Sequence, residues 1–287
     1  MLDPAWMLTR PILWGVLAAL IALLVVRAVV KDRREFQQFK QYSSTVRRQA
    51  MFRKWLLESF AMFGGASVVI LLAAGAFVAP LLSDVIGWPG IRDLRALLGA
   101  DPTLTIGILV GVVIAVVALT RWGAIAARKE QDVVTIGDIS ALLPRNRQEL
   151  RLGALLSVNA GVVEEVMFRL ALPALISGAS GSSIAAIAGS VLLFGALHVY
   201  QGIAGVVGTT VVGAVLMTFY LVSGTIIVPI IVHALIDLRS LVIIPVAVYS
   251  VHKVDGVAHP FTDTPFVAEA AASVEAPTAP VVGTTQD

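Results

Sequence analysis

The stretch Gly161-Val-Val-Glu-Glu-Val-Met-Phe-Arg169 places two glutamates and an arginine inside a long apolar run. An apolar run of this length indicates a membrane-spanning helix. An ionisable residue at that depth is costly, so it marks a functional site with a nearby partner. Two later apolar runs each contain one histidine, His198 and His233. We therefore expect these three segments to form one polar site within the membrane.

The composition is that of a membrane protein. Of the 287 residues, 57% are hydrophobic and only 14% are charged, and the mean hydropathy is +0.88. Soluble domains carry about 25% charged residues. The chain has no cysteine, which excludes disulfides, thiolate zinc sites and cysteine nucleophiles. The basic residues lie close to membrane spans, so no nucleic-acid partner is expected.

Several apolar runs are long enough to cross the hydrocarbon core, which needs about 20 helical residues. They cover residues 11–30, 57–82, 103–120, 152–176, 184–200, 203–222 and 226–248. The expected fold class is all-α, a polytopic transmembrane helix bundle of about seven spans. The segments 31–55 and 121–151 are rich in lysine and arginine, so the positive-inside rule places them in the cytoplasm. This orientation leaves the N-terminus outside and the C-terminus in the cytoplasm.

The chain is expected to have three parts. Residues 1–148 form an N-terminal region of three spans with basic cytoplasmic loops. Residues 149–250 form a four-span catalytic core. Residues 251–287 form a tail that is rich in alanine, proline, threonine and valine and shows no apolar period. Such a composition predicts disorder.

Helical spacing separates the roles of the three charges in the opening stretch. Residues four apart share one face of a helix, so Glu165 and Arg169 are placed to form an ion pair, with the acid in the favourable N-terminal position. Glu164 lies about 100° away around the helix. It is therefore left free to face a cavity. The plainer alternative is that all three charges only hold helices together.

The two histidines each share a helix face with a residue one turn away, His198 with Phe194 and His233 with Asp237. Together with Glu164, these polar residues could hold a water between a carboxylate base and imidazole donors. They could equally bind a divalent metal such as zinc, because neutral imidazole and carboxylate are ordinary zinc ligands. The sequence leaves both possibilities open. A lone histidine in an apolar helix can also be a hydrogen-bonded core residue.

Three motifs occur in a fixed order. They are Glu164-Glu165-x-x-x-Arg169, Phe194-x-x-x-His198 and His233-x-x-x-Asp237. Over residues 150–240 the chain resembles the CPBP family of intramembrane proteases, also called Abi or type II CAAX prenyl endopeptidases. The resemblance implies an all-helical hydrolase that cleaves peptide bonds and is usually labelled a metalloprotease. Glu164 with His198 would activate a water, and His233 with Asp237 would stabilise the oxyanion.

The resemblance also implies partners and a location. The substrate would be a peptide or a membrane protein, and in eukaryotic relatives it is a prenylated CAAX protein. The chain would be a multi-pass protein of a bacterial plasma membrane, in contact with the lipid bilayer. The family often has asparagine at position 237. An ionised Asp237 can only accept hydrogen bonds, so it could instead orient His233 or bind a metal.

Two other functions remain open. One is a catalytically silent membrane scaffold or bacteriocin-immunity-type protein, a role linked to bacterial members of the family. The other is a rhomboid-like serine protease, because Gly178-Ala-Ser180-Gly181 matches Gly-x-Ser-Gly and a Ser180–His233 dyad is conceivable. The rhomboid Ala-His-x-x-Gly pattern is missing, and Ser180 lies in a turn where glycine and serine are expected anyway.

Overall fold

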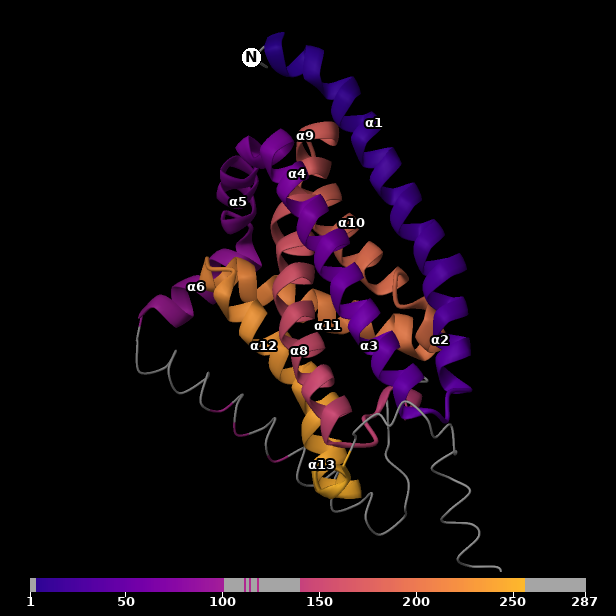
Figure 1. Ribbon diagram of the computed structural model, residues 1–287. Helices are drawn as coiled ribbons and strands as arrows, with labels where there is room; N and C mark the ends of the chain where they lie inside the picture. Colours follow the sequence, from indigo (N-terminus) through magenta and orange to yellow (C-terminus); the bar gives the residue numbers. More distant parts are fainter. Residues whose placement is uncertain (1–3, 101–110, 112–113, 115–117, 119–139, 256–287) are drawn as a thin grey trace, which may run out of the picture.

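The computed structural model describes residues 4–100, 111, 114, 118 and 140–255, and every regular element within these ranges is helical (Figure 1). The predicted all-α class is confirmed. The expected span over residues 103–120 lies almost entirely outside the described residues. Most of the expected tail, from residue 256 onward, lies outside them as well.

The first half of the chain forms two long antiparallel helices and a short helical branch (Figure 1). The first long helix consists of α1 (Pro4–Val26), a π-helical turn (Arg27–Asp32) and α2 (Arg33–Lys40). The second consists of α3 (Thr45–Ser59), a π-helical turn (Phe60–Gly64) and α4 (Gly65–Ala74). The branch consists of α5 (Val78–Ile86) and α6 (Pro89–Ala100).

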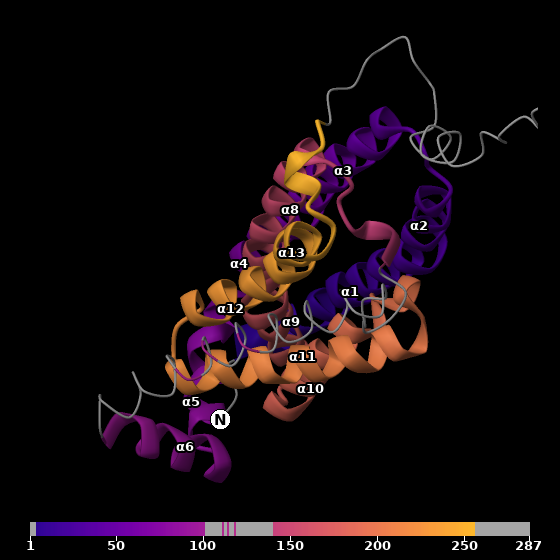
Figure 2. The same ribbon diagram turned by 90° about the horizontal axis from the view of Figure 1, so that it is seen from below.

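The second half is built around one central helix, formed by α8 (Arg147–Glu165), a π-helical turn (Val166–Ala171) and α9 (Leu172–Ser180). It is followed by α10 (Ser183–Ala196), α11 (Gly202–Ser223), α12 (Ile227–Leu238) and α13 (Ile244–Tyr249). The helix α8 lies between α3 and α12 and packs against both (Figure 2). The central helix is therefore surrounded by elements from both halves of the chain.

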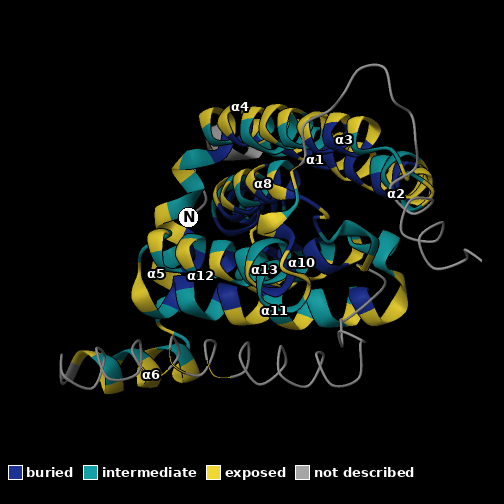
Figure 3. Cartoon of the chain, turned by 60° about the horizontal axis from the view of Figure 1, so that its bottom comes forward, coloured by how far each residue is buried: buried dark blue, intermediate teal, exposed yellow. Residues whose placement is uncertain are grey.

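The outer helices present an apolar surface. Exposed residues lie on the outward faces of these helices, whereas buried ones concentrate where helices meet (Figure 3). Leu72 and Ile203 are 85% and 86% exposed, while Leu172 and Leu175 of the central helix are fully buried. Apolar patches of this extent are rare on soluble proteins. They suit a surface that faces lipid.

Four helices of the described part are long and apolar enough to cross a membrane. They are Thr9–Lys40, Thr45–Ile86, Val199–Ser223 and Ile227–Tyr249, and α10 is apolar but shorter. The chain is thus an integral membrane protein of the helical-bundle type, and the count of seven spans stays a prediction.

Pro173 lies directly after a change of winding in the middle of the central helix. Proline has no N–H, so the carbonyl of Arg169, four residues earlier, loses its helical donor. The turn Val166–Ala171 before it is π-helical. Single π turns inside α-helices frequently lie at functional sites. Here the change of winding begins directly after Glu165.

The helices α8 and α12 cross closely because Gly161 has no side chain. A Cβ atom at this position would lie 3.0 Å from the Cβ and N atoms of Ala234 and 3.0 Å from the carbonyl oxygen of Ile230. Small residues at such crossings let membrane helices approach one another. The close crossing brings the charged turn of α8 next to the histidine of α12.

We predict that Gly161→Ala destabilises the protein by about 1–3 kcal/mol, because the added methyl group presses on the backbone of α12. The matched control is Gly65→Ala, where a Cβ would meet nothing within 4 Å. Alanine is the better helix former by about 1 kcal/mol, so the control should be neutral or stabilising. Thermal unfolding in detergent measures both variants. A Gly161→Ala variant as stable as the wild type would contradict the close crossing.

Candidate active site

Glu165 is the centre of a buried hydrogen-bond network. Its carboxylate is fully buried, and Arg169 donates to both oxygens, with Nε 2.8 Å from Oε2 and Nη2 3.1 Å from Oε1. The predicted ion pair is therefore present. The Nδ1 atom of His233 also lies 2.8 Å from Oε1, a contact that the spacing of the sequence did not reveal. Glu165 thus joins the central helix to α12.

His233 and Asp237 lie one turn apart on α12, as their spacing predicted. The Nε2 atom of His233 lies 3.8 Å from Oδ2 of Asp237, too far for a direct hydrogen bond. The His233 side chain is 7% exposed and that of Asp237 is 34% exposed. The pair therefore extends from the buried network toward the accessible part of the site.

His198 lies after the end of α10 and not inside a helix as expected from the apolar run 184–200. The helix ends at Ala196, and the backbone N–H of His198 donates to Gly195 instead of Phe194. The His198 ring supplies the missing donor, because its Nδ1 atom lies 2.8 Å from the Phe194 carbonyl oxygen. A carbonyl only accepts, so Nδ1 carries the hydrogen and Nε2 of the neutral ring is an acceptor.

The Phe194 ring lies next to polar side chains from all three motifs. Its centroid lies 5.0 Å from that of His198 and 6.0 Å from that of His233. The guanidinium carbon of Arg169 lies 5.2 Å from the same ring centroid. Gly213 of α11 makes room for the ring, because a Cβ there would lie 2.8 Å from Cδ1 of Phe194. One aromatic side chain therefore contacts all three motifs.

Glu164 differs from its neighbour in exposure. Glu165 is fully buried, whereas Glu164 is only partly buried. Glu164 directly precedes Glu165 at the end of α8, so the two carboxylates leave the same turn of the central helix. Glu164 therefore lies beside the Glu165–His233 network with a side chain that is not closed off.

Ser180 lies away from this site. The continuous helix carries it roughly 20 Å beyond Glu165, at about 1.5 Å per residue. Its hydroxyl donates to the carbonyl of Ile176 at 2.7 Å, while His233 is bound to Glu165. The structure does not bring Ser180 and His233 together as a catalytic dyad.

The donor groups as placed do not form a metal site. Within residues 4–100 and 140–255, no group of three or more His, Asp or Glu side chains is positioned to hold a metal ion. Both oxygens of Glu165 are engaged, and so is the Nδ1 atom of each histidine.

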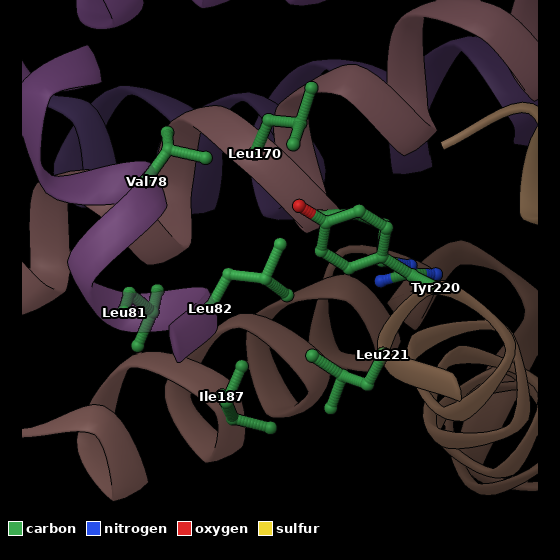
Figure 4. A pocket seen from close by; sticks show the side chains of 8 residues that line it. Val78, Leu81, Leu82, Leu170, Ile187, Tyr220 and Leu221 are labelled. Carbon is green, nitrogen blue, oxygen red and sulfur yellow. The ribbon is translucent and has the colours of Figure 1, made fainter. Parts of the chain in front are cut away.

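A small, mostly apolar pocket adjoins Arg169 between α5, α10 and α11 (Figure 4). Its lining consists of Val78, Leu81, Leu82, Arg169, Leu170, Ile187, Tyr220 and Leu221. The Nη1 atom of Arg169 is buried without a hydrogen-bond partner in the described part of the chain. A buried donor without a partner is costly. The side-chain hydrogen bonds of Arg169 in the described part of the chain go to the Glu165 carboxylate.

The fold and this network define an integral membrane protein with a Glu–His site buried in its helix bundle. A comparison with protein-family models matches residues 146–239 to the family described as type II CAAX prenyl endopeptidase Rce1-like. The match confirms the resemblance found in the sequence, and it gives this segment the fold of CAAX-type intramembrane endopeptidases, a protease family. Comparisons with curated proteins and with solved structures found no match.

We predict that Arg169→Met destabilises the protein by about 3–5 kcal/mol, because it leaves the buried Glu165 carboxylate without its cation. The control is Arg92→Gln on α6. Arg92 pairs with Asp93 at 2.8 Å, but both side chains are more than half exposed. An exposed pair contributes about 0–1 kcal/mol. Chemical denaturation in detergent compares the variants, and equal losses would show that the buried pair has no special role.

Proposed function

We propose that the protein is an intramembrane endopeptidase in which Glu164 and His198 activate a water molecule. The observation that carries this proposal is the hydrogen bond from His198 Nδ1 to the Phe194 carbonyl, since it leaves Nε2 free to accept. Glu164 adds a second carboxylate, which takes no part in the ion pair between Glu165 and Arg169. Peptide hydrolysis needs such a base for water and later an acid for the leaving nitrogen.

The two residues act in sequence in the proposed reaction. The His198 ring accepts a hydrogen bond from the water and orients it. Glu164 takes a proton from the water as the water oxygen bonds to the peptide carbonyl carbon. When the C–N bond breaks, Glu164 returns that proton to the leaving nitrogen. The products are a carboxylic acid and an amine, and both residues regain their starting states.

His233 is proposed to face the developing oxyanion. A doubly protonated ring would donate Nδ1–H to Glu165 and Nε2–H toward the substrate oxygen. Asp237 is one turn away and, when ionised, can only accept. We therefore assign Asp237 to orienting the Nε2 side of His233, and Glu165 with Arg169 to fixing its Nδ1 side.

The proposed setting follows the topology expected from the sequence. Residues 149–250 form a four-span catalytic core in a protein of about seven spans, with the N-terminus outside and the C-terminus in the cytoplasm of a bacterial cell. The substrate is a peptide or membrane protein that reaches the site from the bilayer. The name of the matched family makes a prenylated CAAX peptide the first substrate class to test.

A catalytically silent scaffold is the second candidate, because bacterial members of the family that the chain resembles are linked to bacteriocin immunity. The presence of a residue suited to its role at every motif position favours the enzyme. A scaffold would need the Glu165–Arg169 pair for stability but would have no use for a second, partly exposed carboxylate.

We predict that Glu164→Gln lowers kcat by about 10²- to 10⁴-fold, the usual contribution of a general base. The measurement uses protein in phospholipid vesicles and a fluorescence-quenched peptide with a farnesylated cysteine before its last three residues. Quantitative proteomics of protein termini extends the comparison to native membrane proteins. The control is Ser180→Ala, which should leave kcat unchanged.

Two results would contradict this assignment. Activity lost with Ser180→Ala but kept with Glu164→Gln would indicate a serine protease. Identical protein termini in cells with the wild type and with Glu164→Gln, together with no peptide cleavage, would favour the scaffold.

Whether catalysis requires a bound metal ion can be tested separately. Since the proposed steps use only side chains of the protein, we expect dialysis of the wild type against a chelator to leave kcat unchanged. Loss of activity that zinc restores, with zinc bound in one equivalent, would overturn the metal-free mechanism.

A further inference from the structure

Tyr200 lies beside His198 but belongs to none of the three motifs. It is part of the short 3₁₀ turn Val199–Gln201 that connects α10 to α11. Its ring centroid lies 5.9 Å from that of His198, with 31° between the ring planes. Phe36 of α2, which is 2% exposed, packs edge-on against the same ring at 5.3 Å. The tyrosine ring is therefore held next to the proposed water-activating histidine.

The Tyr200 hydroxyl has a hydrogen to donate. The side-chain amide of Gln201 donates through Nε2 to the hydroxyl oxygen at 2.9 Å. Because this bond uses the oxygen as an acceptor, the phenolic hydrogen can be given to another group. The contact of the Tyr200 ring with the His198 ring places this residue beside the candidate site.

The position of Gln201 is itself built into the start of α11. A Cβ at Gly205, one turn later, would collide with the Cβ of Gln201. Glycine at this position leaves room for the glutamine side chain. Gln201 can therefore hold the Tyr200 hydroxyl in one orientation, which makes it a positioning residue.

The proposed reaction needs a second donor for the oxyanion. His233 gives Nδ1–H to Glu165, and Arg169 gives Nε and Nη2 to the same carboxylate. An ionised Asp237 has no hydrogen to give. This leaves His233 Nε2 as the one donor so far assigned to the substrate oxygen, whereas oxyanion sites usually present more than one.

We propose that Tyr200 is a further catalytic residue, which donates its phenolic hydrogen bond to the carbonyl oxygen of the scissile peptide bond as the oxyanion forms. This role rests on the proposed peptidase function. No proton is transferred and no covalent bond forms at Tyr200. The hydroxyl stabilises negative charge that exists only in the transition state and the tetrahedral intermediate, so its contribution falls on kcat and not on KM.

The test uses Tyr200→Phe, which keeps the ring and its packing against Phe36 and His198 and removes only the hydroxyl. With the farnesylated peptide in vesicles, kcat should fall by about 10²- to 10³-fold, the usual loss for one oxyanion donor. KM and the thermal unfolding temperature should not change. The matched control is Tyr249→Phe at the exposed end of α13, which should match the wild type in all three.

A double-mutant cycle tests the positioning role of Gln201. Gln201→Leu should lower kcat in the wild-type background but cause no further loss in Tyr200→Phe, because it acts through the hydroxyl. A merely structural glutamine would give additive losses.

The outcomes separate this inference from the proposed function. If Glu164→Gln is inactive and Tyr200→Phe keeps wild-type kcat, the role of Tyr200 is wrong and the peptidase stands. If Tyr200→Phe lowers the unfolding temperature and raises KM instead of lowering kcat, the residue is structural and the inference is also overturned. If wild type, Glu164→Gln and Tyr200→Phe all fail to cleave both the peptide and native membrane proteins, both proposals fall.

Discussion

The rest of the site depends on the hydrogen bonds that the buried Glu165 carboxylate accepts. It neutralises Arg169 within its own helix and binds His233 of α12. The desolvation cost of burying an ion pair offsets much of the attraction between its charges, so the pair adds little net stability. Its value here is geometric. Two helices far apart in sequence are fixed relative to one another by one carboxylate with three charged or polar contacts.

The central helix can hold this carboxylate in place because it is anchored at its other end as well. Arg48 of α3 is fully buried and donates to Glu149 at 3.1 Å, while the side chain of Asn146 caps the first turn by accepting from the Glu149 N–H at 2.8 Å. Between these two buried ion pairs, Gly161 lets α12 approach. The position of His233 therefore follows from the packing of α8 on both sides.

Local spacing predicted the features that depend on one helix, and it missed those that depend on contacts between helices. The Glu165–Arg169 pair follows from an interval of four residues. The bond from His233 to Glu165 does not, because it joins residues 68 positions apart. The end of α10 at Ala196 was also missed, since apolar residues continue beyond it. That end decides which nitrogen of His198 carries the hydrogen. Tyr200 lies outside every motif, and only its packing against His198 draws attention to it.

The adjacent glutamates show how a membrane site can separate structure from chemistry. A rotation of about 100° between neighbouring residues gives the two carboxylates different surroundings. Glu165 is closed off by Arg169 and His233, so it cannot exchange protons with a water without breaking the network. Glu164 and Asp237 are only partly buried, so they keep the open sides that the proposed chemistry requires. Hydrolysis inside a bilayer needs this asymmetry, because a base that is fully enclosed has no water to activate and one that faces lipid would not stay charged.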